Sequence, residues 1–250
     1  MKRILLLAAL TGALPCFASP ETASGFSLNQ FRIVYPAAEK KGITWSMTNN
    51  TGRAYLMQSW IRPMDFTTGL PAAESDSKEP GDAIPLMVTP PLKRLDPGEQ
   101  LTLRIRLTGM TLPQDRESVF YLSVKGIPAM PDKASQTGGQ LVLAVVNNMK
   151  MFYRPEGLPD EGVKGAAKQL RFSLQNDALV VDNPTPFYIN FSQVTVGGKP
   201  LEAEALRRLV PPKGQQRYPV SAGMRGEVTW QVLDEDSQQT AVQRQTENNS

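Results

Sequence analysis

Two basic residues beside apolar runs are the side chains best placed for chemistry in this chain. Arg32 lies in Phe31-Arg-Ile-Val-Tyr35, and Lys150 comes shortly after the apolar run Leu141-Val-Leu-Ala-Val-Val146. Taken alone, each is more typical of a solvated strand residue, because single exposed charges are ordinary. Their meaning therefore depends on the elements around them.

The usual catalytic and metal-binding side chains are almost absent. The chain has no histidine, and its only cysteine is Cys16. Histidine is the commonest general base and transition-metal ligand, so we expect neither a zinc or copper site nor any other cofactor. A hydrolase would be left with carboxylate or Ser-Lys chemistry, and no paired motif in the sequence indicates either. We therefore expect no enzyme and assign no catalytic residue.

The apolar run before Lys150 predicts an extended strand with two hydrophobic faces. Leu141, Leu143 and Val145 share one face, since successive side chains of a strand point to opposite sides. Two interpretations are open. The strand could lie at the centre of a sandwich, buried on both faces. Alternatively, one face stays uncovered and recruits another polypeptide as a donated strand.

The N-terminus predicts export. Lys2 and Arg3 precede an apolar stretch that ends at Cys16-Phe17-Ala18, which is the pattern of a secretory signal cleaved after Ala18. Lipidation at Cys16 is an alternative that Pro15 disfavours. Of the 27 basic residues two lie in this signal, against 24 acidic residues in all, so the remaining chain is nearly neutral and nothing indicates nucleic acid. No later run approaches the roughly 18 apolar residues of a membrane span.

Short apolar runs separated by turn residues predict an all-β chain. Seven predicted strands within the first part are the number found in an immunoglobulin-like sandwich. Glu156 to Ala167 reads as a linker or as the start of the second domain, and only Leu201 to Leu209 favours a helix. We expect a signal over 1–18, immunoglobulin-like domains over 19–155 and 156–236, and a polar, disordered tail over 237–250. The predicted strands are 26–35, 42–48, 54–61, 84–89, 101–107, 118–124 and 141–151, then 170–175, 178–181, 187–196, 217–219 and 228–233.

Four blocks, in order, resemble one known family. They are Thr89-Pro-Pro-Leu-Lys-Arg-Leu-Asp-Pro-Gly98, Leu112-Pro-Gln-Asp-Arg-Glu-Ser-Val-Phe-Tyr-Leu-Ser-Val-Lys-Gly-Ile-Pro128, Met149-Lys-Met-Phe-Tyr-Arg-Pro155 and Val181-Asp-Asn-Pro-Thr-Pro-Phe-Tyr188. Together they resemble the periplasmic chaperones of the chaperone-usher pilus pathway, the PapD-like family. The second block departs from the family pattern mainly at Ser123. The resemblance implies two immunoglobulin-like domains joined at an angle, with a cleft between them.

The resemblance also implies a function and a site. Such a chaperone binds, folds and caps pilus subunits by donor strand complementation and delivers them to an outer-membrane usher. Arg32 and Lys150 then correspond to the basic pair that holds the subunit's C-terminal carboxylate. The interdomain charge network that the resemblance implies would contain Glu117 and Arg154, completed by either Asp234 or Glu235. The donor strand would present Leu141, Leu143 and Val145 to the subunit.

Other classes of secreted β-sandwich stay open. A pilus subunit would need its own donor extension, for which Ser19 to Gly25 is short and polar. A secreted accessory binding protein without chaperone activity would not depend on Arg32 and Lys150. The twelve residues of Ala129 to Gln140, with no cysteine near them, place the chain nearer the short-loop members of the family. An uncovered donor strip also predicts a self-capping dimer.

Overall fold

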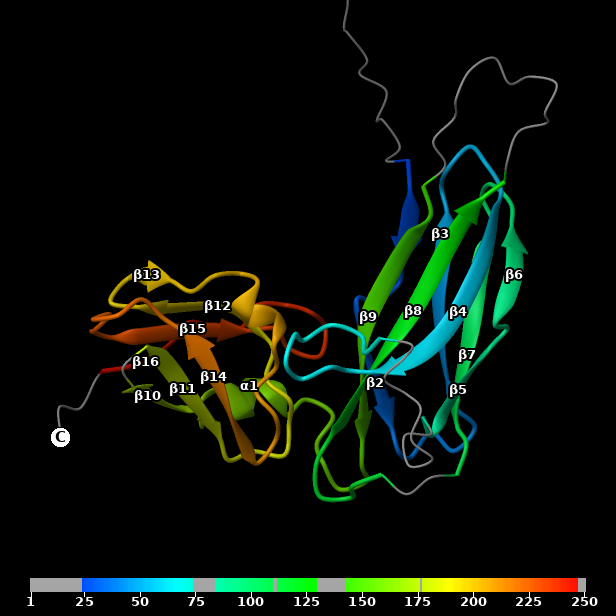
Figure 1. Ribbon diagram of the computed structural model, residues 1–250. Helices are drawn as coiled ribbons and strands as arrows, with labels where there is room; N and C mark the ends of the chain where they lie inside the picture. The colour runs from blue at the N-terminus through cyan, green and yellow to red at the C-terminus, as the bar shows by residue number, and fades with distance from the viewer. Residues whose placement is uncertain (1–23, 74–83, 110–111, 130–142, 176, 247–250) are drawn as a thin grey trace, which may run out of the picture.

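The computed structural model describes residues 24–73, 84–109, 112–129, 143–175 and 177–246. They form two β-sandwiches that lie at an angle to each other, with β1 to β9 in one and β10 to β16 in the other (Figure 1). The all-β architecture expected from the sequence is confirmed. No helix in the described ranges is long and apolar enough to cross a membrane.

The first sandwich packs a four-stranded sheet on a five-stranded one. The four-stranded sheet has the order β1 (Phe26–Leu28), β3 (Ile43–Asn49), β7 (Gln100–Leu107) and β5 (Leu86–Thr89). The five-stranded sheet has the order β2 (Arg32–Pro36), β9 (Val145–Arg154), β8 (Ser118–Pro128), β4 (Tyr55–Pro63) and β6 (Leu92–Leu95). Alternate side chains of both sheets fill the core, and β7 shows this most plainly, with Leu101, Leu103 and Ile105 fully buried between exposed neighbours.

The second sandwich also has two sheets. One has the order β10 (Arg171–Gln175), β11 (Ala178–Asn183) and β14 (Gly214–Pro219), and the other β13 (Lys199–Pro200), β12 (Phe191–Val196), β15 (Val228–Val232) and β16 (Gln243–Gln245). The short helix α1 (Val163–Ala167) and the 3₁₀ turn η3 (Ala205–Arg207) cover the core. Trp230 anchors this core: its ring centroid lies 4.3 Å from that of Phe172, and its Nε1 donates to the Ala167 carbonyl at 2.9 Å.

The first predicted strand is two strands in different sheets. The sequence predicted a single strand over 26–35, but β1 pairs with β3 and β2 pairs with β9. Between them the chain crosses from one sheet to the other. The crossing is held by Asn29, whose backbone and side chain both bond Ser46, and by the Gln30 carbonyl, which accepts from Trp45 Nε1 at 2.9 Å. The alternation of apolar residues changes phase at Asn29-Gln30, from Phe26 and Leu28 to Ile33 and Tyr35, and the prediction of a single strand did not take that break into account.

The helix predicted over 201–209 is present only as a short 3₁₀ turn. Residues 201–209 contain only the turn η3, because the chain becomes extended at Arg208 and Val210 bridges to Ile189. The α-helix instead lies within Glu156 to Ala167, the segment predicted to be a linker or the start of the second domain. Its first turn is capped from elsewhere in the chain, since Glu235 Oε1 accepts from Gly162 N at 3.0 Å and Val163 N at 3.1 Å.

The expectation of a disordered tail was wrong for 237–246. Gln243–Gln245 form β16 and pair with β15. The Gln245 side chain extends this order to the other sheet: Phe172 N donates to its Oε1 at 3.0 Å, and its Nε2 donates to the Phe172 carbonyl at 2.7 Å. A glutamine amide thus bonds a strand edge as a peptide group would, which a search for apolar residues cannot detect. The predicted signal over 1–18 lies outside the described residues.

Candidate functional site

A cavity of about 370 Å³ opens where the two sandwiches meet. The first sandwich lines it from β1, β2, β8 and β9, and the second from the segment before β12 and the turn after β15. Its polar or aromatic walls include Arg32, Tyr121, Asn148, Lys150, Phe152, Asn190 and Ser237.

Strand pairing brings the two predicted basic residues together. β2 and β9 run parallel, and their register sets Arg32 opposite Lys150. Because paired residues in adjacent strands lie on the same face of a sheet, both side chains reach the cavity. These residues are 118 positions apart in sequence, so only the fold makes them a pair.

Arg32 is a buried cation. Its side chain is 6% exposed, and none of its three guanidinium nitrogens has a partner among the described residues. The guanidinium carbon lies 3.8 Å from the centroid of the Phe152 ring, a cation–π contact that leaves the N–H groups unused. Burial lowers the pKa of Arg32 to about 10, opposed by the nearby Glu117 carboxylate. An unsatisfied buried donor is costly, so this geometry favours an incoming acceptor.

Lys150 is held by the second sandwich. Its Nζ donates to Asn190 Oδ1 at 3.2 Å and to the Arg207 carbonyl at 3.1 Å. Both acceptors are neutral. Burial and, to a smaller extent, the charge of Arg32 together lower the pKa of Lys150 to about 8. The two positive charges therefore repel each other, and a bound anion would offset this repulsion.

The N-terminal half of β9 has a free edge in the described structure. β8 pairs with β9 from Val145 to Tyr153, whereas β2 pairs only from Lys150 to Arg154. Residues 145–149 therefore have no described strand beside them on the β2 side. Leu143 and Val145 are 68% and 53% exposed beside that edge. Leu141, the third residue of the expected donor strip, lies outside the described residues.

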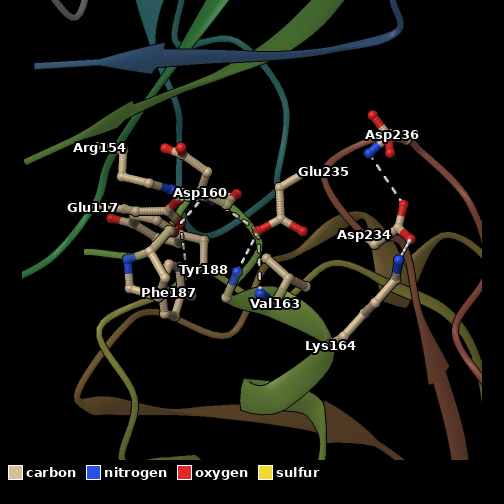
Figure 2. A network of polar contacts seen from close by, with 12 residues as sticks. Glu117, Arg154, Asp160, Val163, Lys164, Phe187, Tyr188, Asp234, Glu235 and Asp236 are labelled. Atoms are coloured by element: carbon tan, nitrogen blue, oxygen red, sulfur yellow. Dashed lines mark hydrogen bonds and ion pairs between the residues drawn. The ribbon is translucent and has the colours of Figure 1, made fainter. Parts of the chain in front are cut away.

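A buried charge network joins the sandwiches (Figure 2). Arg154 is 1% exposed and donates to Glu117 Oε1 through Nε at 3.0 Å and Nη2 at 2.8 Å. The same Nη2 bonds Glu235 Oε1 at 3.0 Å, while Nη1 bonds the carbonyls of Pro159, at 3.0 Å, and Asp160. Glu117 also accepts from Tyr188 N at 2.9 Å. Burial raises the pKa of Glu117, and Arg154 opposes that shift.

The two candidate acids of the C-terminal turn lie in different places. Glu235 contacts Arg154, whereas Asp234 Oδ1 accepts from Asp236 N at 3.1 Å and Gln238 N at 2.8 Å. Asp234 Oδ2 pairs with Lys164 at 3.2 Å, as Figure 2 also shows. Asp234 therefore stabilises its own turn and α1, and Glu235 is the acid that reaches the network.

Sequence reasoning missed the residues that the second sandwich adds to the cavity. Asn190 and the Arg207 carbonyl hold Lys150, and neither belongs to a motif. The nearest signal was the block Val181 to Tyr188, which ends two residues before Asn190. Ser123, the departure within the second block, donates to Asn148 Oδ1 at 2.7 Å beside the cavity.

Comparisons with known proteins agree across both sandwiches. Residues 25–159 match the family "Pili and flagellar-assembly chaperone, PapD N-terminal domain", and 165–241 match "Pili assembly chaperone PapD, C-terminal domain". The chaperone protein FocC of Escherichia coli is 33% identical, over 91% of this chain and 92% of FocC. The chaperone protein FimC of Escherichia coli K12 is 32% identical, over 92% of this chain and 88% of FimC.

Solved structures give the same result. The Salmonella enterica SafA pilin in complex with the SafB chaperone matches with a TM-score of 0.73 at 28% identity, over 90% of this chain and 97% of the matched chain. The Escherichia coli chaperone DraB matches with a TM-score of 0.70 at 32% identity, over 88% and 98%. The paired sandwiches and the sequence likeness through both of them show that this chain belongs to the PapD-like family of chaperones for pilus assembly.

Proposed function

We propose that this chaperone binds pilus subunits by holding the subunit's C-terminal carboxylate between Arg32 and Lys150. The observation that carries the proposal is the buried Arg32 guanidinium, which has no acceptor among the described residues and lies opposite Lys150. A carboxylate offers two oxygens to these donors and cancels the repulsion between the two cations. Hydrogen bonds to charged groups contribute roughly 1.5 to 3 kcal/mol each, so the pair would fix the register of the bound chain.

The subunit's last strand would then extend from this anchor along the free edge of β9. Main-chain hydrogen bonds would form at residues 145–149, which have no strand on that side in the described structure. Leu143 and Val145, with Leu141 as the expected third residue, would enter the groove that an incomplete subunit leaves open. Burying such side chains contributes about 1.5 to 3 kcal/mol each before ordering costs are subtracted. Hydrophobic donation would dominate the affinity, and the basic pair would set the position.

Relatives support this class of partner. One matched structure is a complex of a pilin with its chaperone. By the same reasoning the chaperone would pass its subunit to an outer-membrane usher and work in the periplasm, after cleavage of the signal behind Ala18. The interdomain network of Glu117, Arg154 and Glu235 would keep the two sandwiches at the angle that shapes the cavity.

Capture from the periplasm tests the proposal. Tagged protein is purified from its native host under pilus-expressing conditions, beside an Arg32→Ala, Lys150→Ala double variant. We expect the parent to hold a secreted β-rich subunit in a one-to-one complex and the double variant to lose it. The intact mass of the purified chaperone also reports whether the signal was removed after Ala18.

The variant must remain folded for the loss to count, which its circular dichroism and thermal transition establish. An absent subunit in the parent sample would favour the secreted accessory binding protein instead. Equal capture by parent and variant would leave the chaperone function in place but refute the basic pair as anchor. The exposed strip also leads us to propose a self-capping dimer of the free protein, which a monomer at all concentrations in sedimentation would refute.

A further inference from the structure

The wall of the cavity that belongs to the second sandwich carries its own polar group. Asn190, Leu233 and Ser237 line that side. The Leu233 backbone N–H donates to the Asn190 carbonyl at 2.9 Å, so Asn190 is fixed to the end of β15. Arg32 and Lys150, by contrast, both come from the first sandwich.

Lys150 determines which way the Asn190 amide faces. A lysine ammonium can only donate hydrogen bonds, so the atom 3.2 Å from its Nζ must be the amide oxygen. The amide NH₂ group then lies on the other arm of the same planar group. No described residue accepts a hydrogen bond from this Nδ2, although the half-buried side chain borders the cavity.

We propose that Asn190 is a third group of the subunit anchor, donating from Nδ2 to the terminal carboxylate that Arg32 and Lys150 hold. The inference rests on the proposed function and adds a residue that determines how well the carboxylate is recognised. A carboxylate has about four acceptor positions, more than two basic side chains saturate. A neutral donor fills one of them without the charge repulsion that a third cation would add beside Lys150.

This arrangement makes the anchor a property of both sandwiches. Asn190 would bond Lys150 through its oxygen and the carboxylate through its nitrogen, so one amide would connect the second sandwich to both partners. A carboxylate would then be recognised only when the sandwiches are held at the angle seen here. A rigid interdomain network is consistent with that requirement.

A peptide pair tests the role of Asn190. The probe is a fluorescently labelled, soluble peptide of about ten alternating threonine and valine residues, with either a free C-terminal carboxylate or an amide. Its binding to the mature protein is measured by anisotropy for the parent, Asn190→Ala, Lys150→Met and the double variant. We expect Asn190→Ala to reduce the preference for the acid over the amide about tenfold, the effect of one hydrogen bond to a charged group.

The Lys150→Met background separates direct contact from an effect through the lysine. If Asn190 donates to the carboxylate, its removal reduces the acid preference in both backgrounds. A reduction seen only when Lys150 is present would overturn the inference, because Asn190 would then act by positioning the lysine. Unchanged binding of the amide peptide shows that each variant is folded.

Two further outcomes distinguish this inference from the proposed function. An acid preference that survives Asn190→Ala intact would refute the role of Asn190 and leave the basic pair standing. A parent protein that binds acid and amide equally would refute the carboxylate anchor and this inference with it. Gln193→Ala is the matched control, since Gln193 is an exposed amide on β12 of the same sandwich and does not line the cavity.

Discussion

Arg32 and Lys150 are kept in the cavity at the expense of the free protein's stability. Arg32 has no hydrogen-bond acceptor among the described residues, and Lys150 has only neutral ones. Burial lowers the pKa of Lys150 from its ordinary 10.5 to about 8, which means that the folded protein disfavours the ammonium form. Residues of this kind are typical of binding sites, where the ligand supplies the missing partner.

Replacing Lys150 by a neutral side chain of similar length should therefore stabilise the free protein. We expect Lys150→Met to raise the free energy of unfolding at pH 7 by on the order of 1 to 3 kcal/mol. Between pH 8 and 10.5 the unfolded chain binds more protons at this site than the folded one. The parent should therefore gain stability relative to the variant as the pH rises through this range. Urea unfolding at pH 7 and at pH 10 measures both effects. A variant less stable than the parent at pH 7 would contradict them.

At the scale of the element, β9 combines two kinds of residue along one strand. From Met149 onward its odd-numbered side chains lie in the core of the first sandwich, whereas Val145, on the same face by alternation, is 53% exposed. The strand is thus anchored at one end and open at the other. This division should separate effects on folding from effects on binding.

Charged substitutions at the open end should weaken subunit binding without weakening the fold. Leu143→Asp and Val145→Asp alter side chains that are 68% and 53% exposed, so each should change stability by less than about 0.5 kcal/mol. Both place a carboxylate where the subunit's apolar groove would lie, so capture of the subunit should be lost. Val242→Asp, at a residue 49% exposed in the second sandwich, is the control that should retain it. Retained capture by Leu143→Asp and Val145→Asp would argue against strand donation.

At the scale of the whole molecule, several contacts hold the sandwiches together, and two of them can be tested by substitution. One is the network of Glu117, Arg154 and Glu235, and the other is the loop after β4, which reaches toward the second sandwich in Figure 1. The Gly69 carbonyl of that loop accepts from Tyr121 Oη on β8. Gly69 also packs against the backbone of Arg207, whose carbonyl accepts from Lys150. The loop therefore packs against the residue whose carbonyl holds Lys150.

Gly69→Ala should disturb this interface. A Cβ at Gly69 would lie 2.4 Å from the Arg207 carbonyl oxygen, too close unless the sandwiches move apart. The control is Gly98→Ala: Gly98 has a similar φ, +78° against +72°, but no heavy atom within 4 Å of its added Cβ. Both variants carry the backbone strain of a left-handed residue, so only Gly69→Ala should change the small-angle scattering profile and weaken subunit capture. Identical behaviour of the two variants would refute the supporting role.

Removing Glu117 should destabilise the protein strongly. Glu117→Ala leaves the Arg154 guanidinium buried with fewer partners and the Tyr188 N–H without its acceptor. Breaking a buried pair in this way typically lowers the free energy of unfolding by about 3 to 5 kcal/mol. Denaturant unfolding compares it with Asp115→Ala, which breaks an exposed bridge to Lys213 between the same two sandwiches and should change little. Similar losses from both variants would show that burial is not what makes the network important.

The sequence by itself determined the β class, the order of most strands and the residues worth testing. Alternation along β7 and the apolar run before Lys150 are local patterns, and local patterns reveal which side chains share a face. The turn after β15 contains two acidic residues, Asp234 and Glu235, and the sequence did not indicate which of them contacts the basic partner.

Tertiary structure decided what long-range pairing controls. It split residues 26–36 between two sheets, set Arg32 opposite Lys150, and directed Glu235 rather than Asp234 to Arg154. It also brought Asn190, which belongs to no sequence motif, into contact with Lys150. The Gln245 side-chain amide is ordered by its hydrogen bond with the Phe172 backbone. These contacts join residues far apart in the chain, and their geometry depends on how two independent cores pack. No local pattern of side chains records that packing.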